Sequence, residues 1–164
     1  LSSDTGRRLS EAAGLHINDI MLDNDIPYID LKPHPWRGLK TRGSQRQIPL
    51  VGASLWAAKR IKETNSDAVY AFPRYNNTST TNGNSASAAI NKWLKTRVPE
   101  GCVIHSFRHS VRDRLREVQC PADMIDQIGG WSTAGVGQAY GDGYNLNTLF
   151  HNMKDIQCHV SFKD

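Results

Sequence analysis

The segment HSFRHSVRDRLREVQ, residues 105–119, constrains the fold most, because its apolar residues recur at a helical spacing. They stand every three or four positions, at Phe107, Val111, Leu115 and Val118. On an α-helix this spacing places them on one face, which we expect to turn inward. Pro121 stops this helix, and the next segment, PADMIDQIGG, begins with proline and ends with glycine, as a second helix would.

Further helices and a short β-hairpin are predicted in the rest of the chain. The β-rich runs IPYIDLKP (26–33) and RQIPLV (46–51) flank a segment rich in glycine and proline, which indicates a hairpin. The polar run 74–87 predicts a long surface loop. Helical patterns mark three other segments, at residues 2–14, 53–64 and 86–98. The expected fold is therefore α+β, mainly α-helical, with a helical core and a small antiparallel sheet.

The composition fits one globular domain covering residues 1–164, with 38% hydrophobic and 22% charged residues. No stretch of about 18 apolar residues and no signal peptide is present in the sequence, so we expect a cytoplasmic protein. Three widely spaced cysteines and scattered histidines fit neither a disulfide framework nor a metal site, and we expect no metal and no cofactor. The formal charge of +4 favours an anionic partner without identifying one.

The pair His105 and Arg108 is the first candidate for a binding site. Residues three apart share one helix face, and Arg112 continues that face. A guanidinium offers a planar fork to two phosphate oxygens, and a histidine can move a proton near neutral pH. A solvated basic face with a structural histidine is the alternative for such a pair taken alone.

Five ordered motifs make the chain resemble the catalytic domain of the tyrosine recombinases, the phage-integrase family. They are TGRRLSE (5–11), LKTRGSQRQIPL (39–50), HSFRHS (105–110), IGGWS (128–132) and QAYGDGY (138–144). The resemblance spans nearly the whole chain. It also implies an N-terminal DNA-binding domain, which we expect to lie outside this chain.

The resemblance implies a catalytic role for six residues: Arg8, Lys40, His105, Arg108, Trp131 and Tyr140. In the family a tyrosine attacks a DNA phosphodiester and forms a 3′-phosphotyrosyl link. The tyrosine usually follows the His or Trp position by nine residues, which selects Tyr140, and Tyr144 is the fallback nucleophile. Cationic donors stabilise the charge that develops on the phosphate, and a lysine serves as the general acid. Glu11 is expected to be buried and to orient an arginine.

The chain departs from the family pattern near the tyrosine. Gly129 stands where leucine is usual, Trp131 stands where histidine is more common, and Gly141 and Asp142 replace a frequent Thr-His pair. These departures concern fine geometry more than chemistry. Ordinary structural roles remain open for Lys40, which other cations flank, and for Trp131 as a core residue. Arg7 is expected to be a surface charge, and His109 a hydrogen-bonded structural histidine.

The expected partner is double-stranded DNA, held at its phosphates by surrounding cations. The candidates for these contacts are Lys32, Arg37, Arg42, Arg46, Arg112 and Arg114. The family further implies assembly of protomers on DNA through the C-terminal segment 146–164, although the isolated domain can be monomeric. Two alternatives remain: a type IB topoisomerase, and a DNA-binding module without catalysis on the same fold. A metal-dependent nuclease lacks a credible carboxylate cluster.

Overall fold

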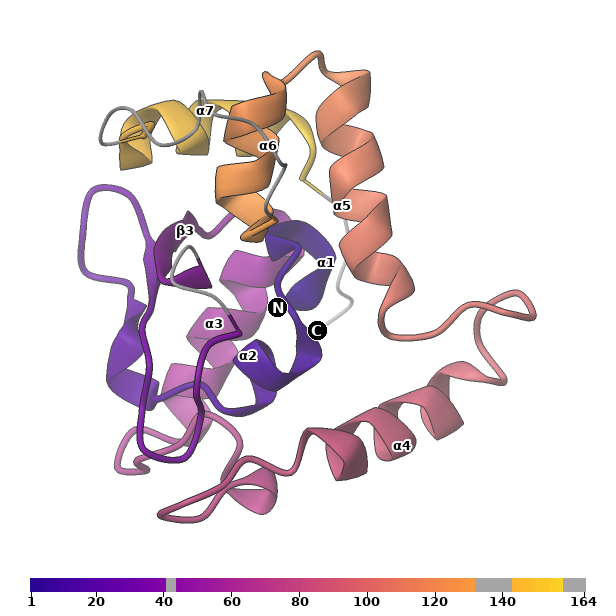
Figure 1. Cartoon of the computed structure of the whole chain (residues 1–164). Coiled ribbons are helices and arrows are strands. Elements are labelled where there is room, and N and C mark those ends of the chain that lie inside the picture. The colour runs from indigo at the N-terminus through magenta and orange to yellow at the C-terminus, as the bar shows by residue number, and fades with distance from the viewer. Residues whose placement is uncertain (41–43, 132–142, 158–164) are drawn as a thin grey trace.

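The structure is a computed structural model that describes residues 1–40, 44–131 and 143–157. Helices dominate it, and a three-stranded antiparallel sheet lies beside them (Figure 1). The expected α+β, mainly helical fold is confirmed. None of the described helices has the length and apolar character that crossing a membrane requires.

The sheet contains β1 (Ile20–Met21), β2 (Tyr28–Leu31) and β3 (Arg46–Pro49), in that order. Strands β2 and β3 form the predicted hairpin, in which Ile29 pairs with Ile48 and Leu31 with Arg46. Ile29, Leu31 and Ile48 are fully buried, whereas Gln47 is exposed. This alternation is the period of two that a half-buried sheet needs.

The helix predicted at the N-terminus is two short helices, α1 (Ser2–Thr5) and α2 (Leu9–Ala13). The break lies at Gly6, whose φ of 60° is left-handed. A Cβ at Gly6 would lie 3.1 Å from Val111 Cγ1, so glycine also permits the close approach of the neighbouring helix. The break places Arg8 at the N-cap of α2.

Four other helices agree with the sequence prediction in position and differ at their ends: α3 (Gly52–Thr64), α4 (Gly83–Leu94), α5 (Ser106–Glu117) and α6 (Ala122–Gly129). A further helix, α7, covers Leu146–Asp155. Val118, expected to face inward, is 38% exposed because α5 ends one residue before it. The predicted loop at 74–87 is shorter than expected, since α4 already begins at Gly83.

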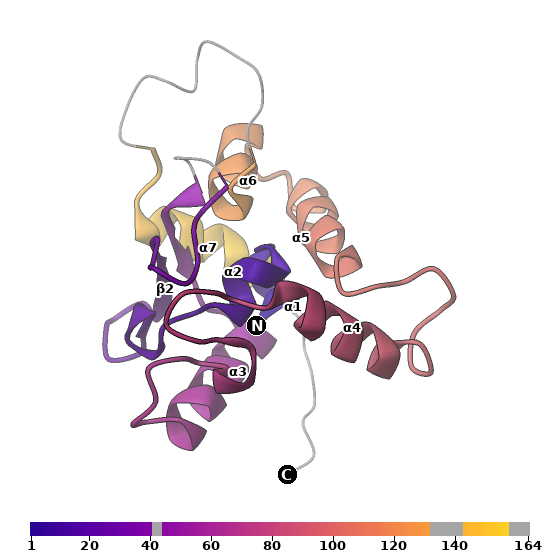
Figure 2. The same ribbon diagram turned by 60° about the horizontal axis from the view of Figure 1, so that its bottom comes forward.

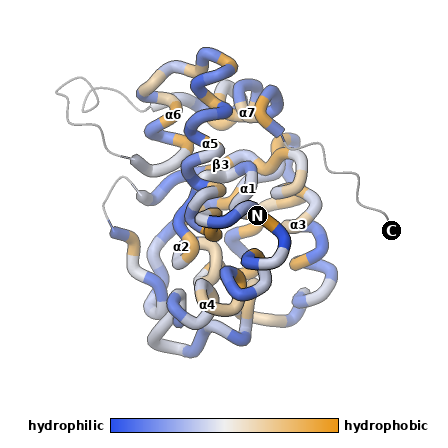
Figure 3. Tube along the Cα trace, turned by 90° about the vertical axis from the view of Figure 1, so that its right-hand side faces the viewer, coloured by the Kyte–Doolittle hydropathy of each residue, from blue (hydrophilic) through white to orange (hydrophobic). Residues whose placement is uncertain are grey.

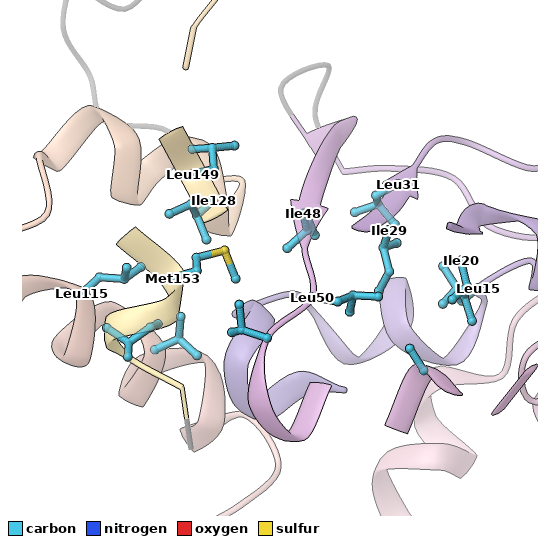
Figure 4. Close-up of a cluster of buried hydrophobic side chains, with 14 of the residues drawn as sticks. Leu15, Ile20, Ile29, Leu31, Ile48, Leu50, Leu115, Ile128, Leu149 and Met153 are labelled. Carbon is cyan, nitrogen blue, oxygen red and sulfur yellow. The ribbon is translucent and has the colours of Figure 1, made fainter. Parts of the chain in front are cut away.

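The core lies between the sheet and the helices α5, α6 and α7. In Figure 4, Ile48 of β3 lies between a group that includes Ile128 and Met153 and a second group formed by Ile29 and Leu31. Burying each such side chain stabilises the fold by about 1.5–3 kcal/mol. Helix α7 packs against β3 and buries Leu149 and Met153 in the chain's own core. The rest of the expected assembly segment, after residue 157, lies outside the described residues.

Helices α5 and α6 pack against one another, and α5 also packs against α1 (Figure 2). The colouring of Figure 3 shows much of α5 as hydrophilic, because its four arginines outnumber its three apolar residues. Val111 and Leu115 nevertheless anchor the helix in the core with no exposed surface. The arginine-bearing face of α5 is thereby held beside the C-terminal end of α6 and the start of α2.

Candidate functional site

Three arginines from distant parts of the chain converge on the C-terminal end of α6. Arg108 Nη1 donates to Gly6 O and, at 2.7 Å, to Gly129 O. Arg46 Nε donates to Ile128 O at 2.8 Å and its Nη2 to Gly129 O at 3.1 Å. Arg8 Nη2 reaches Gly130 O at 3.4 Å. The last carbonyls of a helix lack helical partners and carry partial negative charge, so they can hold several guanidinium groups together.

Glu11 supplies the negative charge of this cluster. Its carboxylate accepts from Arg8 Nη1 at 2.9 Å and Arg46 Nη2 at 3.3 Å, and also from the Arg8 backbone N–H at 3.0 Å. Burial favours the neutral acid, but the charge of Arg46 and the hydrogen bonds from Arg8 outweigh it and lower the pKa of Glu11. Glu11 is therefore ionised at neutral pH and is buried against arginines, as the sequence predicted.

Arg8 and Arg108 differ in how far they reach the surface. The Arg8 side chain is 27% exposed, whereas Arg108 is 5% exposed. Burial, followed by the charge of Arg8, lowers the pKa of Arg108 to about 10. Arg108 therefore stays protonated at neutral pH. Among the described residues, its hydrogen bonds all run through Nη1, which leaves Nε and Nη2 to bind two oxygens of a ligand.

Trp131 lies against these arginines. The Cζ atom of Arg108 is 4.3 Å from the centroid of the indole, and that of Arg112 is 5.2 Å away. The Trp131 backbone N–H donates to Asp126 O at 3.0 Å, which holds the residue at the end of α6. Its indole Nε1 makes no hydrogen bond within the described part of the chain, so this donor can serve a ligand.

His105 lies at the start of α5, one turn from Arg108. It is exposed, and its ring meets His109 edge-on at a centroid distance of 4.9 Å. Partial burial and the charges of His109, Arg108 and Arg8 lower its pKa, so His105 is neutral at pH 7 and can accept a proton. His109 is exposed as well and its ring makes no hydrogen bond to another described residue, which corrects the expectation of a hydrogen-bonded structural histidine.

Two predicted site residues, Tyr140 and Arg42, lie outside the described residues. Lys40 is exposed at the edge of the connection between β2 and β3, and neither hydrogen bond nor ion pair joins it to another described residue. The structure therefore brings together Arg8, Arg108 and Trp131, with His105 close by.

The fallback nucleophile Tyr144 is already engaged. Its hydroxyl donates to the two carboxylate oxygens of Asp123, at 3.1 and 3.0 Å. This hydrogen bond is the main reason why the pKa of Tyr144 is raised, which disfavours the phenolate that the expected nucleophile would need. Gln127 also binds both the backbone N–H and the backbone O of Tyr144, each at 2.8 Å. This arrangement favours Tyr140 over Tyr144.

The candidate phosphate contacts divide by exposure. Lys32 and Arg112 have side chains that are 43% and 33% exposed, although each also pairs with aspartate, Lys32 with Asp19 and Arg112 with Asp126. Arg37 and Arg46 were expected to face solvent, but both are buried. Arg37 is 3% exposed and donates to Glu11 O at 3.0 Å and to Lys32 O, and Arg46 is part of the cluster on α6. These two arginines hold the hairpin to the site and are not placed to grip DNA.

Two further arginines, Arg7 and Arg114, have contacts inside the protein that the sequence did not predict. Arg114 pairs with the buried Asp4 at 3.1 Å and donates to Ser3 O and Ile156 O, so it joins α5 to both ends of the described chain. Arg7, expected at the surface, is 2% exposed. In the sequence each of them stands beside other charged residues, and nothing local indicates that its side chain is buried or paired inside the fold.

The sequence profile of the Phage integrase family matches residues 1–145, and the chain therefore belongs to this family. Among solved structures, its fold is similar to that of the Tn1549 transposon integrase, which was determined in complex with circular intermediate DNA. The two share 19% sequence identity with a TM-score of 0.51, and the match covers 92% of this chain and 54% of that chain. The chain thus spans about half the length of that solved integrase. No curated protein matches this chain significantly.

Proposed function

We propose that this chain is the catalytic domain of a tyrosine recombinase that cuts and rejoins double-stranded DNA, as the integrase of a prophage or genomic island does. Membership of the Phage integrase family supports the proposal. The observation that carries it is the meeting of Arg8 and Arg108, far apart in sequence, beside the indole of Trp131, whose N–H has no partner among the described residues. Such a group of cations and donors suits the nonbridging oxygens of a phosphodiester.

The proposed reaction exchanges one phosphate ester for another. The phenolic oxygen of Tyr140 bonds to phosphorus as the bond from phosphorus to the 5′ oxygen breaks. His105, neutral at pH 7, takes the phenol proton, and Lys40 gives a proton to the departing 5′ oxygen. The 3′-phosphotyrosyl link keeps the energy of the broken ester, so attack by a second 5′ hydroxyl can join exchanged strands without ATP.

The arginines have different tasks in this reaction. Arg8 is partly exposed and can approach the phosphate from the side of α2. Arg108 is fixed through Nη1 and can present Nε and Nη2. Glu11 and the carbonyls at the end of α6 hold the cations before the substrate arrives. Groups that are already in place need no reorganisation when charge develops in the transition state.

Trapping of the covalent intermediate tests the function. The full-length protein, incubated with a nicked duplex that carries its attachment site, should form a covalent band on a denaturing gel. Tyr140→Phe should abolish this band because the attacking oxygen is removed, whereas Tyr144→Phe should retain it. Loss of the band in Tyr144→Phe alone would move the nucleophile to Tyr144.

Two other results would replace the proposal. Salt-sensitive DNA binding without any covalent band would indicate a binding module on the same fold. A covalent band whose products are relaxed circles without exchanged junctions would indicate topoisomerase activity. Exchange between two duplexes also requires more than one protomer, and assembly on DNA is part of the proposed function.

A further inference from the structure

Position 129 is a glycine, although its backbone conformation does not require one. It is the last residue of α6, and its φ lies outside the left-handed region, unlike that of Gly130 at 60°. Glycine within a helix costs about 1 kcal/mol relative to alanine. The space around Gly129 accounts for the glycine.

The indole of Trp131 fills the space that a side chain at position 129 would need. A Cβ built on Gly129 would lie 1.8 Å from Cζ3 and 1.9 Å from Cε3 of Trp131. Both separations fall far below the 3.0 Å under which real Cβ contacts essentially never occur. Alanine at this position already forces the indole to move. The observed position of the Trp131 indole therefore requires a glycine at position 129.

The position of the indole matters because Arg108 stacks on it. The guanidinium is held in two ways: by carbonyls that accept from Nη1, and by the indole 4.3 Å from Cζ. Gly6 lines the same space, since a Cβ there would lie 3.3 Å from Trp131 Cη2. A planar guanidinium bound at one edge and stacked on an aromatic ring has little freedom to rotate.

We propose that Gly129 is a positioning residue of the recombination reaction: by lacking a side chain, it lets the Trp131 indole lie over the end of α6 and fix Arg108. This inference rests on the proposed function. A side chain at position 129 displaces the indole, so Arg108 loses its stacking partner and the Trp131 N–H leaves its place. DNA affinity, which comes mainly from other phosphate contacts, changes little, and the chemical step slows.

A compensating pair of substitutions separates positioning from simple damage. Leucine at position 129 can fill the apolar space that the six-membered ring of the indole occupies, and histidine at 131 keeps an N–H donor in a smaller ring. Volume-conserving exchanges of this kind are tolerated better than single changes. Gly129→Leu should therefore be rescued by Trp131→His in the same chain.

The kinetic test uses the full-length protein and the nicked duplex at saturating concentration. Gly129→Leu should slow formation of the covalent band by about 100-fold, with the dissociation constant for DNA within about threefold of wild type. The double variant Gly129→Leu with Trp131→His should regain at least about tenfold of that loss. Gly129→Ala should also slow the reaction, and Gly83→Ala is its matched control: that helical glycine has only ordinary contact with Ser10 at 3.6 Å, so the control should react as wild type does.

A second measurement does not depend on DNA chemistry. In the NMR spectrum of the full-length protein, the Hα protons of Gly129 should be shifted upfield by the indole ring, and Trp131→His should remove the shift. Unshifted Gly129 protons would overturn the proposed packing. A double variant that folds but reacts no faster than Gly129→Leu would overturn the positioning role. A wild-type protein with shifted protons but no covalent band would instead overturn the proposed function.

Discussion

Arg7 is next to Arg8 in the sequence, but its side chain is buried without hydrogen bonds to other described residues, whereas that of Arg8 is partly exposed and hydrogen-bonded. Its side chain is buried, and within residues 1–40, 44–131 and 143–157 neither Nε, Nη1 nor Nη2 has a hydrogen-bond partner. Burial is the main reason why its pKa falls to about 9, although Glu11 opposes the shift. A buried cation without hydrogen bonds is unfavourable, and an apolar side chain of similar length often improves stability. We predict that Arg7→Met raises the free energy of unfolding by about 1–4 kcal/mol in urea titration.

The same substitution has a pH signature. The folded-state pKa of Arg7, about 9, lies well below the ordinary range of an arginine, so the folded state releases this proton first. The penalty for burying the charge is present in full below pH 9 and is relieved as the pH rises above 9. The advantage of Arg7→Met should therefore shrink above that pH. Arg116→Met, at a side chain that is 59% exposed, is the control and should change stability by less than about 0.5 kcal/mol. A destabilised Arg7→Met protein would contradict this account.

At the scale of elements, Asp4 connects three helices. Its carboxylate accepts from the backbone N–H of Ser54 in the first turn of α3, at 3.1 Å, and from Arg114 of α5, also at 3.1 Å. Asp4 itself belongs to α1 and is fully buried. Asp4→Ala removes the charge that balances Arg114 and should lower the free energy of unfolding by about 3 kcal/mol.

Urea unfolding of Asp4→Ala beside Asp113→Ala checks this prediction. Asp113 pairs with Arg116 at 3.4 Å on the surface, and its side chain is 66% exposed, so its removal should have an effect below about 1 kcal/mol. Equal unfolding midpoints for the two variants would show that Asp4 does not connect the helices energetically.

The elements that could be predicted from the sequence are those with a local signal. The apolar spacing from Phe107 to Leu115 specifies α5, and the two β-rich runs specify the hairpin. A local signal was also overlooked: Asn82 caps α4 by accepting from the Ser85 backbone N–H at 2.9 Å, within a run that otherwise reads as loop. The break at Gly6 also had a local signal, because a glycine in the left-handed region commonly ends a helix, but its close approach to Val111 of α5 had none.

The site residues also divide into those that the sequence predicts and those that only the fold reveals. The motif spacing selects Arg8, His105, Arg108 and Trp131, and the structure places them together. Burial of Arg37 and Arg46 has no local signal, since it depends on carbonyls at the far end of α6 and on Glu11. The sequence reports how many cations the chain has, and only the fold determines which of them remain for a ligand.

At the scale of the whole molecule, the formal charge of +4 does not give the number of phosphate contacts that the proposed function would use. The cations Arg7, Arg37, Arg46 and Arg108 are buried inside the protein, whereas Lys40 is exposed. Each phosphate that a protein neutralises adds about 0.9 to the steepness with which log K falls against log salt concentration. The exposed cations should therefore set this slope.

The salt dependence of duplex binding tests this distribution of charge, with Tyr140→Phe as the background so that no covalent complex forms. Lys40→Ala should make the slope shallower by about 0.9, because one phosphate contact and its released counterion are lost. Lys62→Ala removes the same charge from α3, which lies far from α6 in Figure 2, and should leave the slope unchanged. Equal slopes for the two variants would show that Lys40 does not reach a phosphate in the bound complex. Its role as the proton donor to the 5′ oxygen would then have to be given to another residue.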